Sequence, residues 1–209
     1  MSIESALRGA RASAELEGVA VALPDLKTRT GQDPVVTGSL RVSAAVGELA
    51  ATWERAPLQV LARLHVLFAV GTAPGDELGR PDGQRGTRET ATRLAALAGL
   101  VTGGTGVPAV VLAAVVHGEL LAVTPFGAGD GVIARAAARL VLITRGLDPK
   151  AVSVPEVGHL ELRQDYGDAL AGYLSGTPDG VGAWLRHCCL AAELGAREGL
   201  AVCEAFQRG

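Results

Sequence analysis

Two apolar segments joined by a glycine-rich turn constrain this chain more than any other feature. Pro108 opens an apolar segment that runs to about Val123, and a second one extends from Val132 to about Thr144. The residues between them, TPFGAGDG at 124–131, interrupt the helical pattern because they contain a proline and three glycines. This part of the chain therefore predicts a helix, a tight turn and a second helix.

The scarcity of aromatic residues extends this prediction to the whole chain. Aromatic residues make up 3% of the sequence, although 48% of it is hydrophobic. A core built from Ala, Val and Leu suits closely packed helices better than a β-sandwich. No alternating strand pattern is evident. We expect an all-α fold in one domain, residues 1–209, with an N-terminal helix and loop (1–39) packed against a helical core (40–209).

Helical spacing and turn-forming residues place the remaining elements. Further helices are expected over 2–18, over 40–70 with a helix start near Pro57, and over 87–101, 163–174 and 181–206. Segments rich in glycine, proline and polar residues predict loops or connections at 24–39, 71–86 and 147–160.

Charge and hydropathy exclude several classes of partner. The formal net charge is -3, so we expect no binding of nucleic acid. The longest apolar stretch contains His117 and Glu119, which makes it too short and too polar to span a membrane. The N-terminal residues lack the apolar centre of a signal peptide, so we expect a cytoplasmic protein. Small-residue helices often pair, which makes a homodimer a reasonable expectation.

The spacing of the three cysteines matches neither a disulfide pattern nor a zinc site. Cys188 and Cys189 are adjacent and Cys203 is isolated, so neither a disulfide pattern nor the spacing of a zinc site is present. The sequence therefore argues for reduced cysteines and against zinc. His117 lies on an apolar helix and is interpreted as a core histidine. The alternative is a role as a replacement general base.

The glycine-rich turn has the composition of an anion-binding site. Gly127, Gly129 and Gly131 leave backbone N–H groups free at the start of a helix, where the helix dipole also favours an anion such as phosphate. Arg135 and Arg139 lie one and two turns into that helix and can support the site. The alternative is a tight turn whose glycines serve only close packing.

The turn also resembles the signature of the Fic (Fic/Doc) family, His-Pro-Phe-x-x-Gly-Asn-Gly-Arg-x-x-Arg. The matching residues stand in register without a gap: Pro125, Phe126, Gly129, Gly131 and Arg135. The resemblance extends from about residue 50 onward. It implies an all-helical fold and transfer of AMP, or another phosphate-containing group, from a nucleotide bound with Mg²⁺.

The sequence departs from this signature at the positions that carry chemistry. Thr124 replaces the histidine that acts as general base, Ala128 the acidic residue that holds Mg²⁺, and Val132 the first arginine. Asp130 replaces asparagine and brings negative charge into the turn. A carboxylate there can hold a metal or act as a base. We favour instead a role for Asp130 as the cap of the following helix.

A second motif near the N-terminus resembles the inhibitory motif of many Fic proteins. It is the segment SAELEG, from Ser13 to Gly18, and it places Glu17 where the family's glutamate pairs with the second arginine of the signature. We therefore expect an ion pair between Glu17 and Arg135. Because little catalytic apparatus remains to be inhibited, a structural clamp is preferred over a switch.

Two classes of function follow from these observations. The first is a Fic-like protein that is unable to perform ordinary AMP transfer and that acts by binding, as a regulator or partner subunit of an unknown protein or small molecule. The second is an enzyme with unconventional chemistry in the same pocket, with Thr124, Asp130 and His117 as candidate catalytic residues. ATP or another nucleotide with Mg²⁺ is the cofactor that the resemblance allows, and Asp130 is the one candidate metal ligand.

Overall fold

A computed structural model describes residues 3–27 and 33–208. In these residues the chain forms nine α-helices and one short 3₁₀ helix, with no β-strand, so the all-α prediction is confirmed. The elements in chain order are α1 (Ile3–Leu16), η1 (Leu23–Lys27), α2 (Pro34–Trp53), α3 (Pro57–Ala69), α4 (Arg88–Thr102), α5 (Ala109–Val123), α6 (Asp130–Thr144), α7 (Pro155–Glu161), α8 (Arg163–Leu174) and α9 (Pro178–Arg208).

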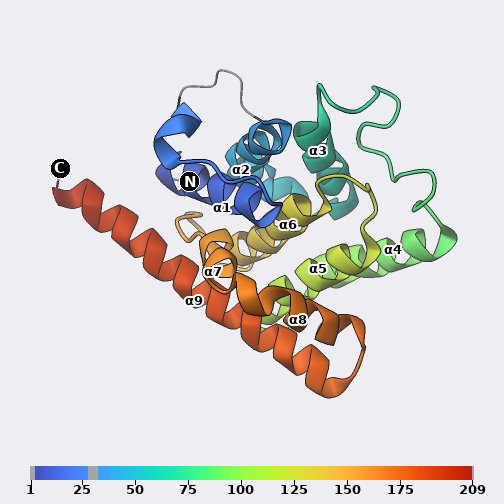
Figure 1. Ribbon diagram of the computed structural model, residues 1–209. Helices are drawn as coiled ribbons and strands as arrows, with labels where there is room; N and C mark the ends of the chain where they lie inside the picture. Colours follow the sequence, from blue (N-terminus) through green and yellow to red (C-terminus); the bar gives the residue numbers. More distant parts are fainter. Residues whose placement is uncertain (1–2, 28–32, 209) are drawn as a thin grey trace.

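The helices on either side of the glycine-rich turn form the centre of the molecule (Figure 1). Eleven of the fifteen residues of α6 are buried, and α6 contacts α1, α2, α3, α5 and α7. Alanine is common at the buried positions of α6, so neighbouring helices approach it closely. The largest core cluster joins α5 and α6 to α2, α3 and α4, and includes Trp53, Leu64, Leu112 and Leu140.

The N-terminal helix packs against this core, as expected. α1 contacts α2, α6 and α7, and its buried residues are small, among them Gly9, Ala10 and Ala12. Two serine hydroxyls fasten this interface, because Ser5 donates to the Val152 carbonyl at 2.9 Å and Ser43 donates to the Ala6 carbonyl at 2.8 Å.

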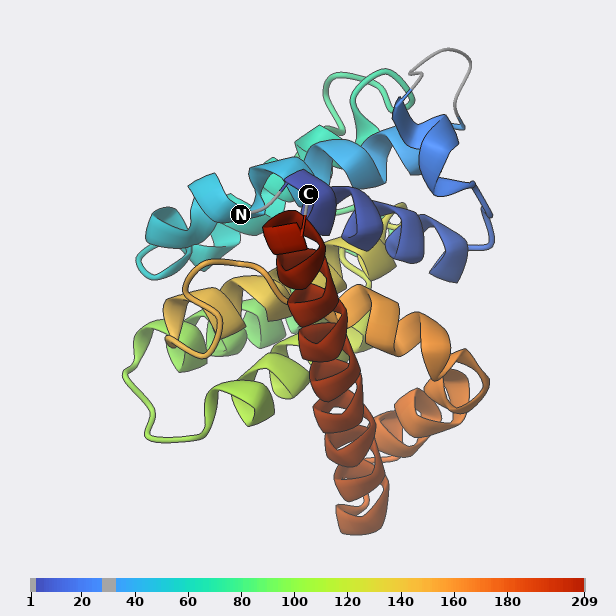
Figure 2. The same cartoon turned by 90° about the vertical axis from the view of Figure 1, so that its left-hand side faces the viewer.

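The opposite side of the core is covered by α7, α8 and α9. Figures 1 and 2 show the 31-residue α9 running across that side of the molecule, and it contacts α5, α7 and α8. The close contact of α9 with α7 requires glycine at position 158, because a Cβ there would overlap the Ala191 carbonyl oxygen. In the described parts of the chain, no helix combines the length and apolarity needed to cross a membrane.

Two sequence predictions of irregular structure are wrong. The predicted loop 24–39 contains η1 and the start of α2, because Asp33 accepts a bond from the Val35 N–H at 2.8 Å and Pro34 begins the helix. The boundary expected between 39 and 40 therefore falls inside α2, while residues 28–32 of that loop lie outside the described part. The predicted connection 147–160 contains α7, which places His159 on a helix rather than in a loop.

Substitution of a single glycine tests the packing between α7 and α9. We expect Gly158→Ala to lower the free energy of unfolding by about 1–3 kcal/mol, since the added methyl group meets rigid backbone. The matched control is Gly167→Ala in α8, where a Cβ meets no atom within 4 Å. This variant should be neutral or more stable by up to about 1 kcal/mol. Chemical denaturation measures both, and equal stability of the two variants would contradict the packing described here.

Candidate functional site

The turn between α5 and α6 is held in a conformation that few residues adopt. Thr124, which ends α5, has φ 40° and ψ 60°, while Gly127 and Gly129 have φ of 78° and 71°. Glycine adopts such angles freely, whereas a β-branched residue such as threonine is strained there. Strain of this kind persists only where the surroundings hold the backbone in place.

Neighbouring elements enclose the turn on two sides. The Phe126 ring is buried and stacks on His65 of α3, with ring centroids 4.4 Å apart, so Phe126 anchors the turn in the core. A Cβ at Gly129 would overlap the ring of Phe68, which explains the glycine there. The loop before α4 contributes Asp82, whose N–H donates to the Pro125 carbonyl at 2.9 Å.

The Asp130 carboxylate binds the turn rather than the helix. Its two oxygens accept bonds from the Phe126 N–H at 3.1 Å and the Gly127 N–H at 2.7 Å. Asp130 is the first residue of α6, and Gly129 is its N-cap. The expectation that the Asp130 side chain caps α6 is therefore wrong, because the carboxylate binds N–H groups of the turn before the helix. Burial raises the pKa of the Asp130 carboxyl, although both N–H donors oppose this shift.

The Thr124 hydroxyl is engaged by a cation from the same loop before α4. Arg85 donates to Thr124 Oγ1 at 2.7 Å, and the Arg85 Nε lies 3.8 Å from an Asp82 carboxylate oxygen. These contacts tie the loop to the end of α5. A threonine hydroxyl does not titrate near neutrality, so Thr124 offers no general base of its own.

The expected pair between Glu17 and Arg135 is present. The Arg135 Nη2 lies 2.7 Å from Glu17 Oε1, and the same guanidinium donates to the Ser13 hydroxyl at 2.8 Å and to the Ser13 carbonyl at 3.1 Å. The Arg135 side chain is 3% exposed and that of Glu17 is 28% exposed. α1 ends at Leu16, and Gly18, with φ 90°, completes the turn that follows the helix. α1 is thus fastened to α6 by one buried guanidinium.

The Glu17 carboxylate also lies directly against the turn. A Cβ at Gly131 would overlap Glu17 Oε1. Gly131 is the third glycine of the GAGDG turn and the second residue of α6. A carboxylate of the chain itself therefore occupies the position beside the helix N-terminus where an anion is favoured.

The second arginine that the sequence assigned to an anion site faces elsewhere. Arg139 is fully buried, lies 3.5 Å from Glu156 of α7, and donates to the Ala151 carbonyl at 3.3 Å. The hypothesis that Arg139 supports the turn is therefore wrong. One extra helical turn carries its side chain away from the glycines and under the loop before α7.

His117 belongs to a separate buried cluster. Its Nε2 is 2.8 Å from the Tyr166 hydroxyl of α8, and its ring contacts His159 of α7 and Trp184 of α9. Burial holds the pKa of His117 and of His159 well below the ordinary value, and neighbouring positive groups add to the effect. The structure does not bring His117 into contact with Thr124 or Asp130. This cluster is not predictable from the sequence, because its members come from four different helices.

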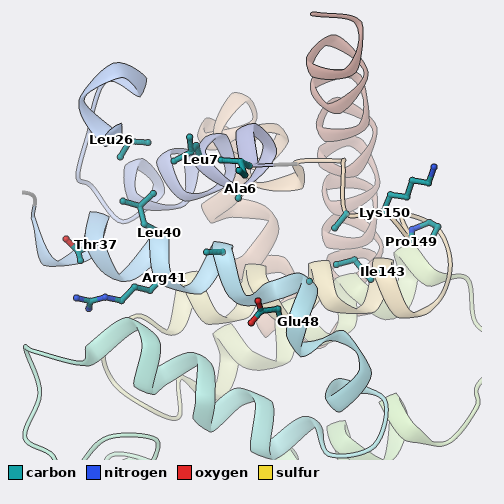
Figure 3. Close-up of a pocket in the computed structure, with 14 residues that line it drawn as sticks. Ala6, Leu7, Leu26, Thr37, Leu40, Arg41, Glu48, Ile143, Pro149 and Lys150 are labelled. Carbon is teal, nitrogen blue, oxygen red and sulfur yellow. The ribbon is translucent and has the colours of Figure 1, made fainter. Parts of the chain in front are cut away.

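A large cavity also lies away from the turn. It has a volume of about 880 Å³ and opens between α1, α2 and the segment after α6 (Figure 3). Leu7, Leu26 and Leu40 form an apolar part of its lining, while Arg41, Glu48 and Lys150 supply charge. None of the site residues predicted from the sequence lines this cavity.

Reversal of charge at position 17 tests the clamp between α1 and α6. Glu17→Arg should lower the free energy of unfolding by about 3 kcal/mol, because it leaves the buried Arg135 unpaired and faces it with a second cation. The control is Glu193→Arg, which removes an exposed pair with Arg197 on α9 and should change stability by less than about 1 kcal/mol. Thermal and chemical denaturation measure both, and an unchanged Glu17→Arg protein would refute the clamp.

Removal of the Asp130 carboxylate tests whether it shapes the turn. Asp130→Ala should cost about 2–4 kcal/mol, since the Phe126 and Gly127 N–H groups lose a charged acceptor. Asp168→Ala on the exposed face of α8 serves as the control and should have little effect. Equal stabilities in chemical denaturation would show that the turn holds its shape without the carboxylate.

Comparison with known proteins supports the fold. No family model matches the sequence, and no curated protein is similar to it at a significant level. Among solved structures, the chain is similar to a Fic family protein from Desulfovibrio desulfuricans G20, with a TM-score of 0.75 and 20% sequence identity. The match covers 95% of this chain and 65% of that one, so the chain spans less than two thirds of its neighbour. At this identity the likeness concerns the fold alone, and the chain has the all-helical fold of a Fic family protein.

Proposed function

We propose that this chain is a Fic-like protein with a degenerate catalytic motif, which does not carry out ordinary AMP transfer and acts by binding, as a regulator or partner subunit. The observation that carries the proposal is the position of Glu17. Its carboxylate fills the space against Gly131 and pairs with Arg135, the residue that matches the phosphate-binding arginine of the family. A phosphate entering there meets a negative charge instead of a free cation.

The other motif positions also fit a nucleotide with Mg²⁺ poorly. Ala128 offers a methyl group where the family has a metal-binding carboxylate. Val132 is buried in the core cluster and supplies no charge to the turn. Asp130, the one carboxylate of the turn, already accepts two backbone N–H bonds. These contacts support a role for the motif in packing and not in catalysis, and we derive no reaction step through a bound nucleotide.

The second candidate is an enzyme with unconventional chemistry at the same turn, transferring a nucleotide or another phosphate-containing group to a protein or small-molecule acceptor. Two observations favour it: the strained backbone of Thr124 and the raised pKa of the buried Asp130 carboxyl, both of which are common at functional sites. Against it, the third candidate, His117, contacts Tyr166, His159 and Trp184 in a separate cluster.

Nucleotide binding and group transfer separate the two candidates. We expect the wild type to bind neither pyrophosphate nor ATP with Mg²⁺ in calorimetry. Glu17→Gly should gain measurable binding of pyrophosphate, because it frees the Arg135 guanidinium and the N-terminus of α6. Neither protein should transfer label to itself or to lysate proteins from nucleotides labelled at the α- or γ-phosphate.

The matched control is Glu15→Gly, which removes a carboxylate two residues before Glu17, at the end of α1, that pairs with Arg11 and Arg163. This variant should behave like the wild type toward pyrophosphate. Label transfer by the wild type or by Glu17→Gly would refute the binding role, and its loss in Glu17→Gly/Asp130→Asn would then assign the chemistry to the turn.

A further inference from the structure

Three side chains with metal-binding atoms meet in the core, apart from the glycine-rich turn. They are His117 of α5, His159 of α7 and Cys188 of α9, and their donor atoms all lie within 4.8 Å of one another. All three are buried, at 1%, 4% and 6% exposure. Within the described residues, no other group of three histidine, cysteine or acidic side chains gathers in this way.

A small cavity lies at the same place. It has a volume of about 20 Å³ and is lined by all three side chains together with apolar residues of α5, α6 and α9, such as Ala114, Leu142 and Ala192. This volume is about that needed for a single water molecule or a small ion. The apolar wall offers no other strong donor for such an occupant.

The His117 ring has a polar atom that the protein leaves without a partner. Its Nδ1 is fully buried and makes no hydrogen bond, whereas its Nε2 is 2.8 Å from the Tyr166 hydroxyl. Buried polar atoms without a partner are rare and unfavourable in folded proteins. An ion in the neighbouring cavity would provide the missing partner.

Both imidazoles are also oriented as metal-binding histidines usually are. In metal sites the second ring nitrogen commonly donates to a neighbouring acceptor, which fixes the ring and its tautomer. Here the Tyr166 hydroxyl takes that place for His117, and the Nε2 of His187 lies 3.1 Å from the Nδ1 of His159. One nitrogen of each imidazole is therefore engaged by a neighbour, and the second nitrogen of His117, Nδ1, has no partner.

We propose that His117, His159 and Cys188 form a binding site for a zinc-class divalent ion. Two imidazoles and one thiolate are the donors that Zn²⁺ prefers, and a water molecule can take the fourth position. In a tetrahedral zinc site the donor atoms lie about 3.5 Å apart. Here they lie within 4.8 Å of one another, so binding draws the donor atoms together by up to about 1.3 Å. The thiol of Cys188 loses its proton to solvent when the metal–sulfur bond forms.

The charges around the site are compatible with a divalent ion. Arg135 is the permanent cation that acts electrostatically on both His117 and His159. Its charge is matched by Glu17, and the thiolate of Cys188 would neutralise part of the charge of the ion. The proposal is independent of the proposed function, because none of its three donors belongs to the turn.

Cobalt is a suitable probe, because a Co²⁺–thiolate bond gives a near-ultraviolet charge-transfer absorption. Full-length protein without a histidine tag, reduced and dialysed against a chelator, should bind one equivalent of Co²⁺ with this absorption. Zn²⁺ should displace the cobalt, abolish the absorption and raise the melting temperature. Failure of the folded protein to bind Co²⁺ or Zn²⁺ would overturn the proposal.

Adjacent cysteines provide the matched control. Cys188→Ser should lose the charge-transfer absorption and bind Zn²⁺ at least tenfold more weakly. Cys189→Ser, which changes an exposed neighbour, should bind as the wild type does. His159→Gln should also weaken binding, and circular dichroism reports whether each variant is folded. Absorption that survives in Cys188→Ser, or that disappears in Cys189→Ser, would assign the metal to another place and overturn the site.

Discussion

The buried guanidinium of Arg135 is the contact on which the arrangement of the turn depends. It lies on the central helix α6 and is held by the hydroxyl and carbonyl of Ser13 and by the carboxylate of Glu17, all at the end of α1. A buried arginine without these partners would be strongly unfavourable. The filled space beside Gly131 therefore follows from one electrostatic requirement, and the same contact adds to the Ser5 and Ser43 hydrogen bonds that hold α1 on the core.

Much of the fold could be predicted because local signals determine it. Helical spacing and the prolines and glycines that punctuate it placed α3, α4, α5, α6 and α8 to within a few residues. The errors occur where a cap or a tertiary contact determines whether a helix forms. Asp33 caps α2 inside a segment with the composition of a loop, and α7 forms where Gly158 allows it to lie against α9. The composition of a short segment does not reveal such a neighbour.

The candidate site was predictable only where the sequence contains a motif. The resemblance to the Fic signature indicated the turn and the pair of Glu17 with Arg135. The resemblance does not predict which way the side chains point. Asp130 accepts a hydrogen bond from the Phe126 N–H, and Arg139 faces Glu156. The cluster of His117, His159 and Cys188 was missed, and the spacing of the cysteines argued against it, because its members meet only when α5, α7 and α9 pack.

The few aromatic residues and histidines of the chain are concentrated at this cluster. The sequence contains two tryptophans, two tyrosines and four histidines, and Trp184, both tyrosines and three of the histidines lie in or beside this one cluster. Trp184 is fully buried and fills a small core cluster, whereas His117, His159 and His187 bring polar ring nitrogens into the same region. Burying several imidazoles together is unfavourable unless their nitrogens find partners, and here His117 Nδ1 has none. Trp184 and Cys188 form a small hydrophobic core cluster with Ala114, against which both tyrosines pack. Packing accounts for these side chains but not for the buried Nδ1 of His117, and the proposed ion would give that atom a partner.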